Sequence, residues 1–278
     1  MSSTATAEAW SGKDRGDENF PVGSLLIRRD LRRHVHAFYA FARNADDIAD
    51  SPILAATEKV ARLDIMENVL LGRADAGSPS ALRLRASLAD TRVTPRHSTD
   101  LLVAFRQDAT RLRYGTWDEL VEYCRYSAMP VGRHVLDLHG EDRATWDPSD
   151  ALCTALQVLN HLQDCAIDLA SLDRCYLPTG LLAECGADVD DLHGPAATPG
   201  LRRVFDALLE RVDALNQTAA ALPRCTRSRR LRLETAVIVG LSHRLARHLR
   251  RADPVGRRVR LRPRDAVVSV LAALRFLP

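Results

Sequence analysis

DLRRHVHAFYAFARNADDIAD, the sequence from Asp30 to Asp50, has the spacing of one long helix with Asp30 in the N-cap position. Apolar side chains recur along it at the three-to-four spacing of an inward-facing stripe: Leu31, Val35, Phe38 or Tyr39, and Ala42. The same spacing continues to Asp46 and then to Asp50. The stripe that buries this helix therefore ends in two carboxylates one turn apart, which point the same way as the apolar residues before them.

Carboxylates on a buried stripe need a cation nearby, because an unpaired ionised carboxylate in an apolar setting costs several kcal/mol. Two carboxylates at i and i+4 suit a hard divalent ion, with Mg²⁺ preferred where a phosphate completes the shell. Arg43, one turn before Asp46, is a candidate anion-binding side chain on the adjoining flank. A solvated acidic helix end is the alternative for the pentad DDIAD taken alone.

A second stretch, ALCTALQVLNHLQDCAIDLASLDRCYLP (151–178), carries a polar stripe on one helical face. Its members lie at i, i+3, i+7 and i+11: Gln157, Asn160, Asp164 and Asp168. The other face is apolar: Leu152, Leu156, Leu159, Ala166 and Ile167. An ordinary solvent face remains possible, but solvent faces in this Arg-rich chain carry arginine. A stripe of amides and carboxylates is more typical of the lining of a polar cavity.

Together, FARNADDIAD (41–50) and QVLNHLQDCAIDLASLDRCYLP (157–178) resemble the squalene/phytoene synthase family, the head-to-head prenyl synthases. The first segment matches the family's D-x-x-x-D, and the second matches its Q-x-x-N-x-x-x-D-x-x-x-D. The motif R-x-Y-x-P follows at Arg174, Tyr176 and Pro178. The resemblance covers roughly residues 18–265. It implies a single-domain, isoprenoid-synthase-type helical bundle around a central cavity.

The resemblance also implies a ligand set and a substrate. Two or three Mg²⁺ ions would be held by Asp46, Asp50, Asn160, Asp164 and Asp168. A prenyl diphosphate would contact Arg43, Gln157, Asn160, Arg174, Tyr176, Tyr123, Phe20 and Ser24. The four aspartates are the catalytic candidates. The aromatic candidates for cation–π stabilisation of a carbocation are Phe38, Tyr39, Phe41, Phe105, Tyr123 and Tyr126.

Two positions distinguish branches of the family. Most phytoene, dehydrosqualene and squalene synthases carry Arg just before the first Asp of the second motif and an acidic residue just before the last. This chain has Gln163 and Ile167 there, as the bacterial hopanoid-pathway branch does. The resemblance then implies that presqualene diphosphate is ionised and quenched with water to hydroxysqualene, without NAD(P)H. We expect the two exchanges to change the charge at the diphosphate end of the pocket.

No alternating strand pattern of useful length occurs, so the chain is predicted to be all-α. Residues 1–17 are polar and predicted to be a disordered tail, which leaves 18–278 as the isoprenoid synthase domain. Helices are expected over 54–71, 79–89, 98–113, 201–221 and 227–251. A capping box from Thr116 to Glu119 opens another, with a break at Pro130 and a close backbone approach at Gly132. The helix of the second motif should begin at Asp147.

The composition excludes several classes of protein. The 278 residues, 46% of them hydrophobic, suit one globular domain with a sizeable core. No run of about 18 uncharged apolar residues occurs, and residues 1–19 do not resemble a signal peptide, which favours a cytoplasmic protein. The six cysteines form no CxxC pair or zinc-like spacing.

The last part of the chain is strongly basic. Residues 224–264 hold 14 arginines against two acids, in a protein whose formal net charge is +3. The stretch has no aromatic residues for stacking on bases, so nucleic-acid binding is not expected. Peripheral contact with the anionic inner face of the membrane would suit an enzyme with greasy substrates. A compositional preference for arginine is the plain alternative, and an inactive assembly subunit that contacts other pathway enzymes is a further one.

Overall fold

The computed structural model describes residues 6–8 and 27–276. The first half contains α1 (Arg32–Ala49), α2 (Ala56–Leu70), α3 (Pro79–Ala89), α4 (Arg96–Thr110), α5 (Trp117–Ser127) and α6 (Met129–Leu138). The second half contains α7 (Trp146–Leu172), α8 (Thr179–Glu184), α9 (Pro199–Ala219), α10 (Leu222–Cys225), α11 (Arg229–Arg251) and α12 (Pro263–Ala273). Within these residues the extended structure is limited to one bridge, Arg113 with Cys175. The prediction of an all-α, single-domain protein is confirmed.

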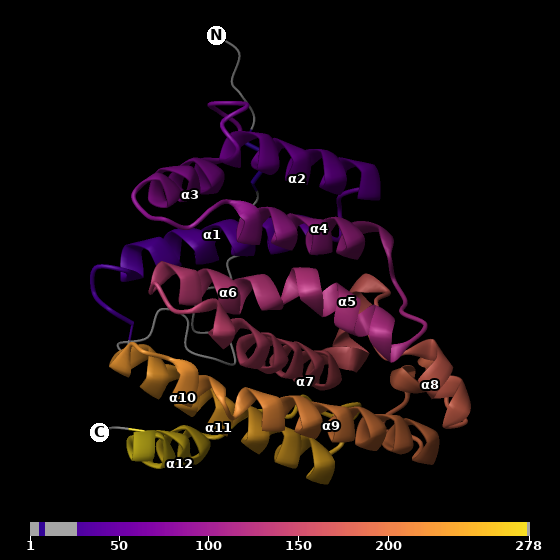
Figure 1. Cartoon of the computed structure of the whole chain (residues 1–278). Helices are drawn as coiled ribbons and strands as arrows, with labels where there is room; N and C mark the ends of the chain where they lie inside the picture. The colour runs from indigo at the N-terminus through magenta and orange to yellow at the C-terminus, as the bar shows by residue number, and fades with distance from the viewer. Residues whose placement is uncertain (1–5, 9–26, 277–278) are drawn as a thin grey trace.

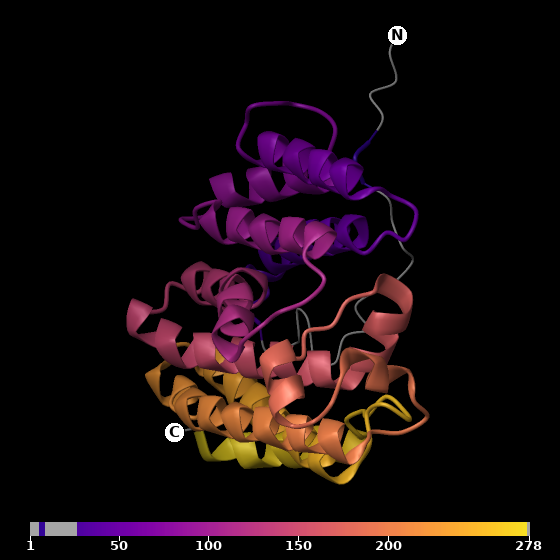
Figure 2. The same ribbon diagram turned by 90° about the vertical axis from the view of Figure 1, so that its right-hand side faces the viewer.

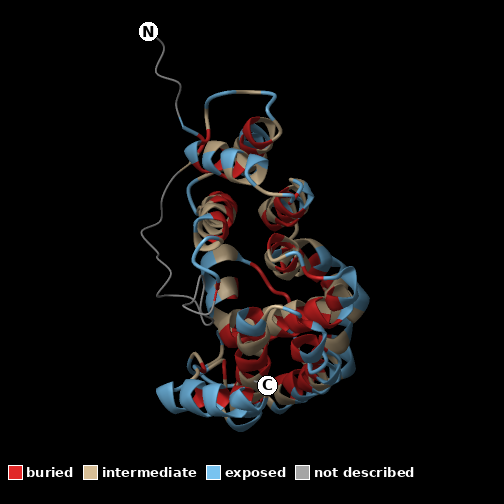
Figure 3. Ribbon diagram, turned by 60° about the vertical axis from the view of Figure 1, so that its left-hand side comes forward, coloured by how far each residue is buried: buried red, intermediate tan, exposed pale blue. Residues whose placement is uncertain are grey.

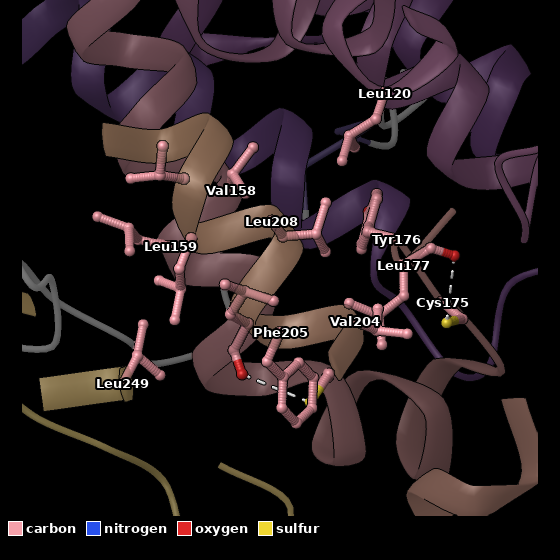
Figure 4. Packing of buried hydrophobic residues seen from close by; sticks show 14 of the residues in the cluster. Leu120, Val158, Leu159, Cys175, Tyr176, Leu177, Val204, Phe205, Leu208 and Leu249 are labelled. Carbon is pink, nitrogen blue, oxygen red and sulfur yellow. Dashed lines mark hydrogen bonds between the residues drawn. The ribbon is translucent and has the colours of Figure 1, made fainter. Parts of the chain in front are cut away.

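The helices are arranged in layers (Figures 1 and 2). Two apolar clusters are the largest among the described residues. One cluster is built from α1, α2, α3 and α4 and includes Phe41, Leu63 and Leu102. The other is built mainly from α5, α7, α9 and α11. Figure 4 shows part of this second cluster, where Val158 and Leu208 lie among the buried residues. Helix α7 packs against α6, α9 and α11 and forms the centre of the lower layers.

Helix α1 begins one residue later than predicted. It starts at Arg32 with Leu31 as the N-cap, and no side chain caps it. Asp30 was the predicted cap, and this prediction is wrong because its carboxylate accepts hydrogen bonds from Arg28 instead, with Arg28 Nε at 3.2 Å. The helix buries Phe38, Phe41 and Ile48 in the first cluster. The adjacent face, which contains Asp46, is left to line a cavity.

Helix α7 continues through the Q-x-x-N-x-x-x-D-x-x-x-D motif without a break, but its apolar stripe differs from the predicted one. Ile167 is 54% exposed, so its predicted place on the buried face is wrong. The stripe continues instead through Leu162, Cys165 and Leu169, which repeat every three to four residues and pack in the second cluster. The helix ends at Asp173, whose φ of 51° is the one positive value among the described non-glycine residues.

The break between α5 and α6 falls at Ala128, and the proline that follows lies in the first turn of α6, where no amide hydrogen is needed. A Cβ atom on Gly132 would lie 2.4 Å from Ser149 Oγ of α7, which confirms the predicted close approach. The cap at Thr116 accepts from the amide of Glu119, whereas the Glu119 carboxylate accepts from Gly115. The predicted capping box is therefore only half formed.

The described part of the N-terminal tail contacts α3. Glu8 accepts a hydrogen bond of 2.8 Å from the Ser80 amide in the first turn of α3, where a carboxylate is stabilised by the helix N-terminus, and Ala7 is buried. The disordered tail stays a prediction. The other residues of the predicted tail lie outside the described ranges, and so do Phe20 and Ser24.

Candidate active site

A cavity of about 760 Å³ lies between the two apolar clusters, with walls from α1, α4, α5, α7 and two loop segments. The predicted site residues among the described ones all line it: Arg43, Asp46, Asp50, Tyr123, Gln157, Asn160, Asp164, Asp168, Arg174 and Tyr176. The two aspartate pairs, which are more than 100 residues apart in the sequence, therefore reach the same cavity.

On the α1 side, Asp46 and Asp50 face the cavity one turn apart. Arg43 pairs with Asp46 at 2.9 Å and with the buried Asp47 at 2.6 Å. Burial and the neighbouring Asp50 carboxylate raise the pKa of Asp46 well above its ordinary value. The carboxylates on this wall of the cavity thus outnumber its arginine, Arg43.

On the α7 side, Asp164 and Asp168 lie opposite. Arg258, from the loop between α11 and α12, pairs with Asp164 at 2.6 Å. Burial, together with repulsion from Asp164 and Asp50, raises the pKa of Asp168 to about 7. An additional cation would stabilise this set of carboxylates.

The floor of the cavity is a network of polar groups around Arg174. Its guanidinium pairs with Asp50 at 2.7 Å and donates to the Ala49 carbonyl oxygen at 3.2 Å. Beside it, Asp108 of α4 accepts hydrogen bonds from Tyr123 at 2.9 Å and from Tyr176 at 2.8 Å. Burial raises the pKa of Asp108 to about 6. The R-x-Y-x-P segment therefore joins the end of α1 to the cavity.

Sequence reasoning missed several cavity residues, among them Asp108, His161 and Arg258. Asp108 carries the signal that identified Asp46, because it continues the inward stripe of α4 that includes Leu101. His161 stacks on Tyr176 with 3.6 Å between ring centroids, and burial lowers its pKa to about 3. Arg258 lies in a loop without periodicity, so no sequence pattern indicated it.

Gln163 and Ile167 do not lie where the sequence analysis expected them. Neither lines the cavity. Gln163 is buried and its amide nitrogen donates to the Val259 carbonyl oxygen, while Ile167 lies at the surface. The expected change in the charge of the diphosphate end is therefore wrong. Through Val259, Gln163 instead holds the loop that carries Arg258.

A second cavity of about 410 Å³ adjoins the first and is mainly apolar. Both are lined by Tyr39, Ala42, Ser127, Gln157 and Asn160. Phe38, Leu152 and Ile238 line only the apolar one. Of the other aromatic candidates, Phe105 lines the polar cavity. Phe41 is buried in the first cluster, and Tyr126 packs against the second.

The donors in the polar cavity fit a hard divalent cation. Carboxylate and amide oxygens are the ligands that Mg²⁺ prefers, and it usually shares them with water and substrate phosphates. Within residues 6–8 and 27–276, no three His, Cys, Asp or Glu side chains are grouped closely enough to bind one ion by themselves.

Comparison with known proteins agrees with this arrangement. Residues 13–265 match the family described as squalene/phytoene synthase. The hydroxysqualene synthase of Rhodopseudomonas palustris is 45% identical over 271 residues, which cover 98% of this chain and 92% of that protein. The hydroxysqualene synthase of Zymomonas mobilis is 42% identical over 251 residues, covering 90% and 84%.

Solved structures have the same architecture. Squalene synthase HpnC from Alicyclobacillus acidocaldarius is similar with a TM-score of 0.75 at 35% identity, over 85% of this chain and 90% of that one. A dehydrosqualene synthase in complex with a ligand has a TM-score of 0.81 at 21% identity, over 94% and 92%, which bears on the fold alone. The predicted isoprenoid-synthase-type bundle is confirmed.

A helical bundle whose central cavity is lined by two opposed aspartate pairs defines an enzyme that acts on prenyl diphosphates. The chain belongs to the squalene/phytoene synthase family.

Proposed function

We propose that this chain is a Mg²⁺-dependent enzyme of squalene and hopanoid biosynthesis that ionises presqualene diphosphate and captures the cation with water. The products would be hydroxysqualene and diphosphate. The observation that carries the proposal is a carboxylate-lined cavity that shares part of its wall with an apolar cavity. Relatives named hydroxysqualene synthase, 42–45% identical over most of the chain, support the product.

Magnesium fits the acidic part of the site. Two or three ions would be held by Asp46, Asp50, Asn160, Asp164 and Asp168. They would supply the positive charge that makes diphosphate a good leaving group. Arg43, Arg174 and Arg258 already point their guanidinium groups at these carboxylates. Each can also donate paired hydrogen bonds to diphosphate oxygens.

The rest of the substrate is hydrocarbon and would occupy the apolar cavity. The walls of the apolar cavity exclude water from most of the hydrocarbon part of the substrate, which protects a carbocation from premature capture. Tyr39 lies between the two cavities, where its ring can stabilise a nearby positive charge. Gln157 and Asn160 stand at the same boundary, where an attacking water molecule can be held by hydrogen bonds.

The proposed reaction needs no reductant. Water adds to the cation and loses a proton to the departed diphosphate, so the alcohol forms without a change in oxidation state. Turnover is therefore expected with Mg²⁺ and without NAD(P)H.

A second candidate is head-to-head coupling of two farnesyl or geranylgeranyl diphosphates to presqualene diphosphate, squalene, dehydrosqualene or phytoene. The four aspartates would serve that ionisation equally well. Because Gln163 and Ile167 lie outside the cavity, the choice between the two reactions rests on the named relatives.

The test is to incubate purified protein with Mg²⁺ and either presqualene diphosphate or farnesyl diphosphate, and to identify products by mass spectrometry. We expect an alcohol from presqualene diphosphate and little coupling of farnesyl diphosphate. Efficient coupling, or a strict need for NADPH, would favour the second candidate. No turnover of either substrate would favour an inactive assembly subunit.

We also propose a cytoplasmic location with peripheral contact to the inner face of the membrane. Farnesyl-derived substrates and a thirty-carbon alcohol partition into lipid, and the arginines of 224–264 are attracted to anionic headgroups. Other enzymes of the pathway are candidate partners at that surface. Among the described residues, no helix combines the length and apolar character needed to cross a bilayer.

A further inference from the structure

Helix α12 buries its polar face against the protein and exposes its apolar face. The residues that it buries against the protein are small or charged: Asp265, Ser269 and Ala273. Its large aliphatic side chains point outward and are 43–61% exposed: Val267, Val268, Val270, Leu271 and, just after the helix, Leu274. In Figure 3, most of the ribbon of α12, beside the C-terminus, has the colour of exposed residues. A surface helix normally has the opposite arrangement.

Specific polar contacts with α11 hold α12 in this orientation. His248 Nε2 lies 2.9 Å from Asp265 Oδ2, and Arg244 Nε donates to Ser269 Oγ at 3.2 Å. The two helices approach closely, since a Cβ atom on Gly240 would lie 3.1 Å from Ser269 Oγ. Rotating α12 to bury its valines would break these contacts and introduce a steric clash. The outward apolar face is therefore built into the packing.

The charge around this face is positive. Arginines flank α12 and its preceding loop, and all of the following are exposed: Arg257, Arg260, Arg262, Arg264 and Arg275. Between residues 254 and 276 the one acidic residue is Asp265, which is buried and ion-paired. An apolar face with a cationic rim matches the boundary between anionic headgroups and acyl chains.

The length of α12 limits how it can contact a bilayer. It has 11 residues, about 16 Å of helix, which is about half of what spanning requires. It can therefore lie in the plane of the interface but cannot cross it. A second copy of the chain is a poorer occupant, because a two-fold contact would bring two sets of these arginines together.

We propose that α12 docks the protein on anionic membranes by inserting its aliphatic face at the headgroup boundary. The loop that leads into α12 also reaches the active-site cavity, which Arg258, Arg260 and Leu261 line. Docking would thus hold the cavity close to lipid. This advantage to the enzyme rests on the proposed function, because it matters for a substrate and product that partition into lipid. The binding itself does not depend on the reaction.

The test is flotation of the full chain with vesicles of phosphatidylglycerol and phosphatidylcholine, without substrate. We expect binding to these vesicles, weak binding to phosphatidylcholine alone, and release at high salt, which screens the arginines. Leu271→Glu should weaken binding about 10-fold or more, because an aliphatic contact is replaced by a charge. Ile53→Glu makes a similar change at an 89% exposed site that is far from α12 in the sequence. This variant should bind vesicles within about 2-fold of wild type.

Unfolding temperature and oligomeric state are measured on the same samples. Both variants should unfold like wild type, since the replaced side chains are largely exposed. The proposal would be overturned by equal binding of wild type and Leu271→Glu, or by no binding of wild type. A wild-type dimer that Leu271→Glu makes monomeric, without vesicle binding, would assign the face to a second copy. A wild type that turns over normally but does not bind vesicles would contradict docking and leave the proposed function standing.

Discussion

Removing one hydroxyl group from the network around Asp108 should make the stability of the protein more dependent on pH. Tyr123 and Tyr176 each donate to one oxygen of this carboxylate. Burial raises the pKa of Asp108 from 3.8 to about 6, although Arg174 and both hydroxyls favour the ionised form. This rise corresponds to about 3 kcal/mol of folding free energy. The stabilisation is fully present below the unfolded-state pKa of 3.8 and is lost as the pH rises through about 6.

Tyr176→Phe deletes a hydrogen bond to the ionised form, which is worth about 1.5–3 kcal/mol. We expect the pKa of Asp108 to rise further, because the ionised form loses more stabilisation than the protonated form. The variant should lose about 2 kcal/mol at about pH 8, where wild-type Asp108 is ionised, and about 1 kcal/mol at about pH 5, where it is mostly protonated. Tyr123→Phe should behave in the same way. Urea unfolding at the two pH values measures both losses.

Tyr114→Phe is the matched control. Tyr114 lies in the same aromatic cluster, with its ring centroid 5.6 Å from that of Tyr176. Its hydroxyl is buried and has no hydrogen-bond partner among the described residues. Deleting this hydroxyl should be neutral or slightly stabilising at both pH values. The reasoning is refuted if Tyr176→Phe costs the same at both pH values, or if Tyr114→Phe shows the same pH dependence.

Three other changes have definite expected outcomes. Asp168→Asn should preserve or slightly raise the unfolding temperature, because burial and nearby carboxylates already disfavour the charge of Asp168. Turnover with Mg²⁺ should fall at least about 100-fold, and unchanged turnover would contradict the proposed role. Gly132→Ala places a methyl group 2.4 Å from Ser149 Oγ and 2.7 Å from Cys153 Sγ. Urea unfolding should therefore show that the free energy of unfolding falls by about 1–3 kcal/mol. Adding Ser149→Ala should partly restore it. Burial lowers the pKa of His134 to about 3 in the folded protein. The stability that comes from keeping this histidine neutral is therefore lost as the pH falls below 6.5, the pKa of the unfolded state. His134→Phe, which keeps the stacking on Phe38, should reduce this slope by about 1.4 kcal/mol per pH unit, as acid unfolding would show.

The aspartates of the site could be placed from the sequence because each continues a regular helical face. Asp46 and Asp50 follow the stripe of α1, and Asp164 and Asp168 follow that of α7. The same reasoning applied to α4 would have found Asp108. Helical geometry is a local property, so a sequence pattern is enough to indicate it.

The errors have physical causes as well. Gln163 precedes Asp164 by one residue, which is a rotation of about 100° around the helix, and at this position the rotation turns the Gln163 amide toward the Val259 carbonyl and away from the cavity. Ile167 stands in the same relation to Asp168. Proximity in a motif was taken as proximity in space. Arg258 was missed because its position depends on a loop that folds back over 94 residues of sequence to reach Asp164.

The polar cavity also separates two apolar clusters that are each continuous within themselves. Across it, Arg174 joins Asp50 over 124 residues of sequence, and these charged contacts connect regions that can unfold with different free energies. A ligand that binds both sides of the cavity would raise the free energy of unfolding of both regions. This increase grows with the logarithm of the ligand concentration. Heat denaturation can therefore report site occupancy in a sample that performs no turnover at all.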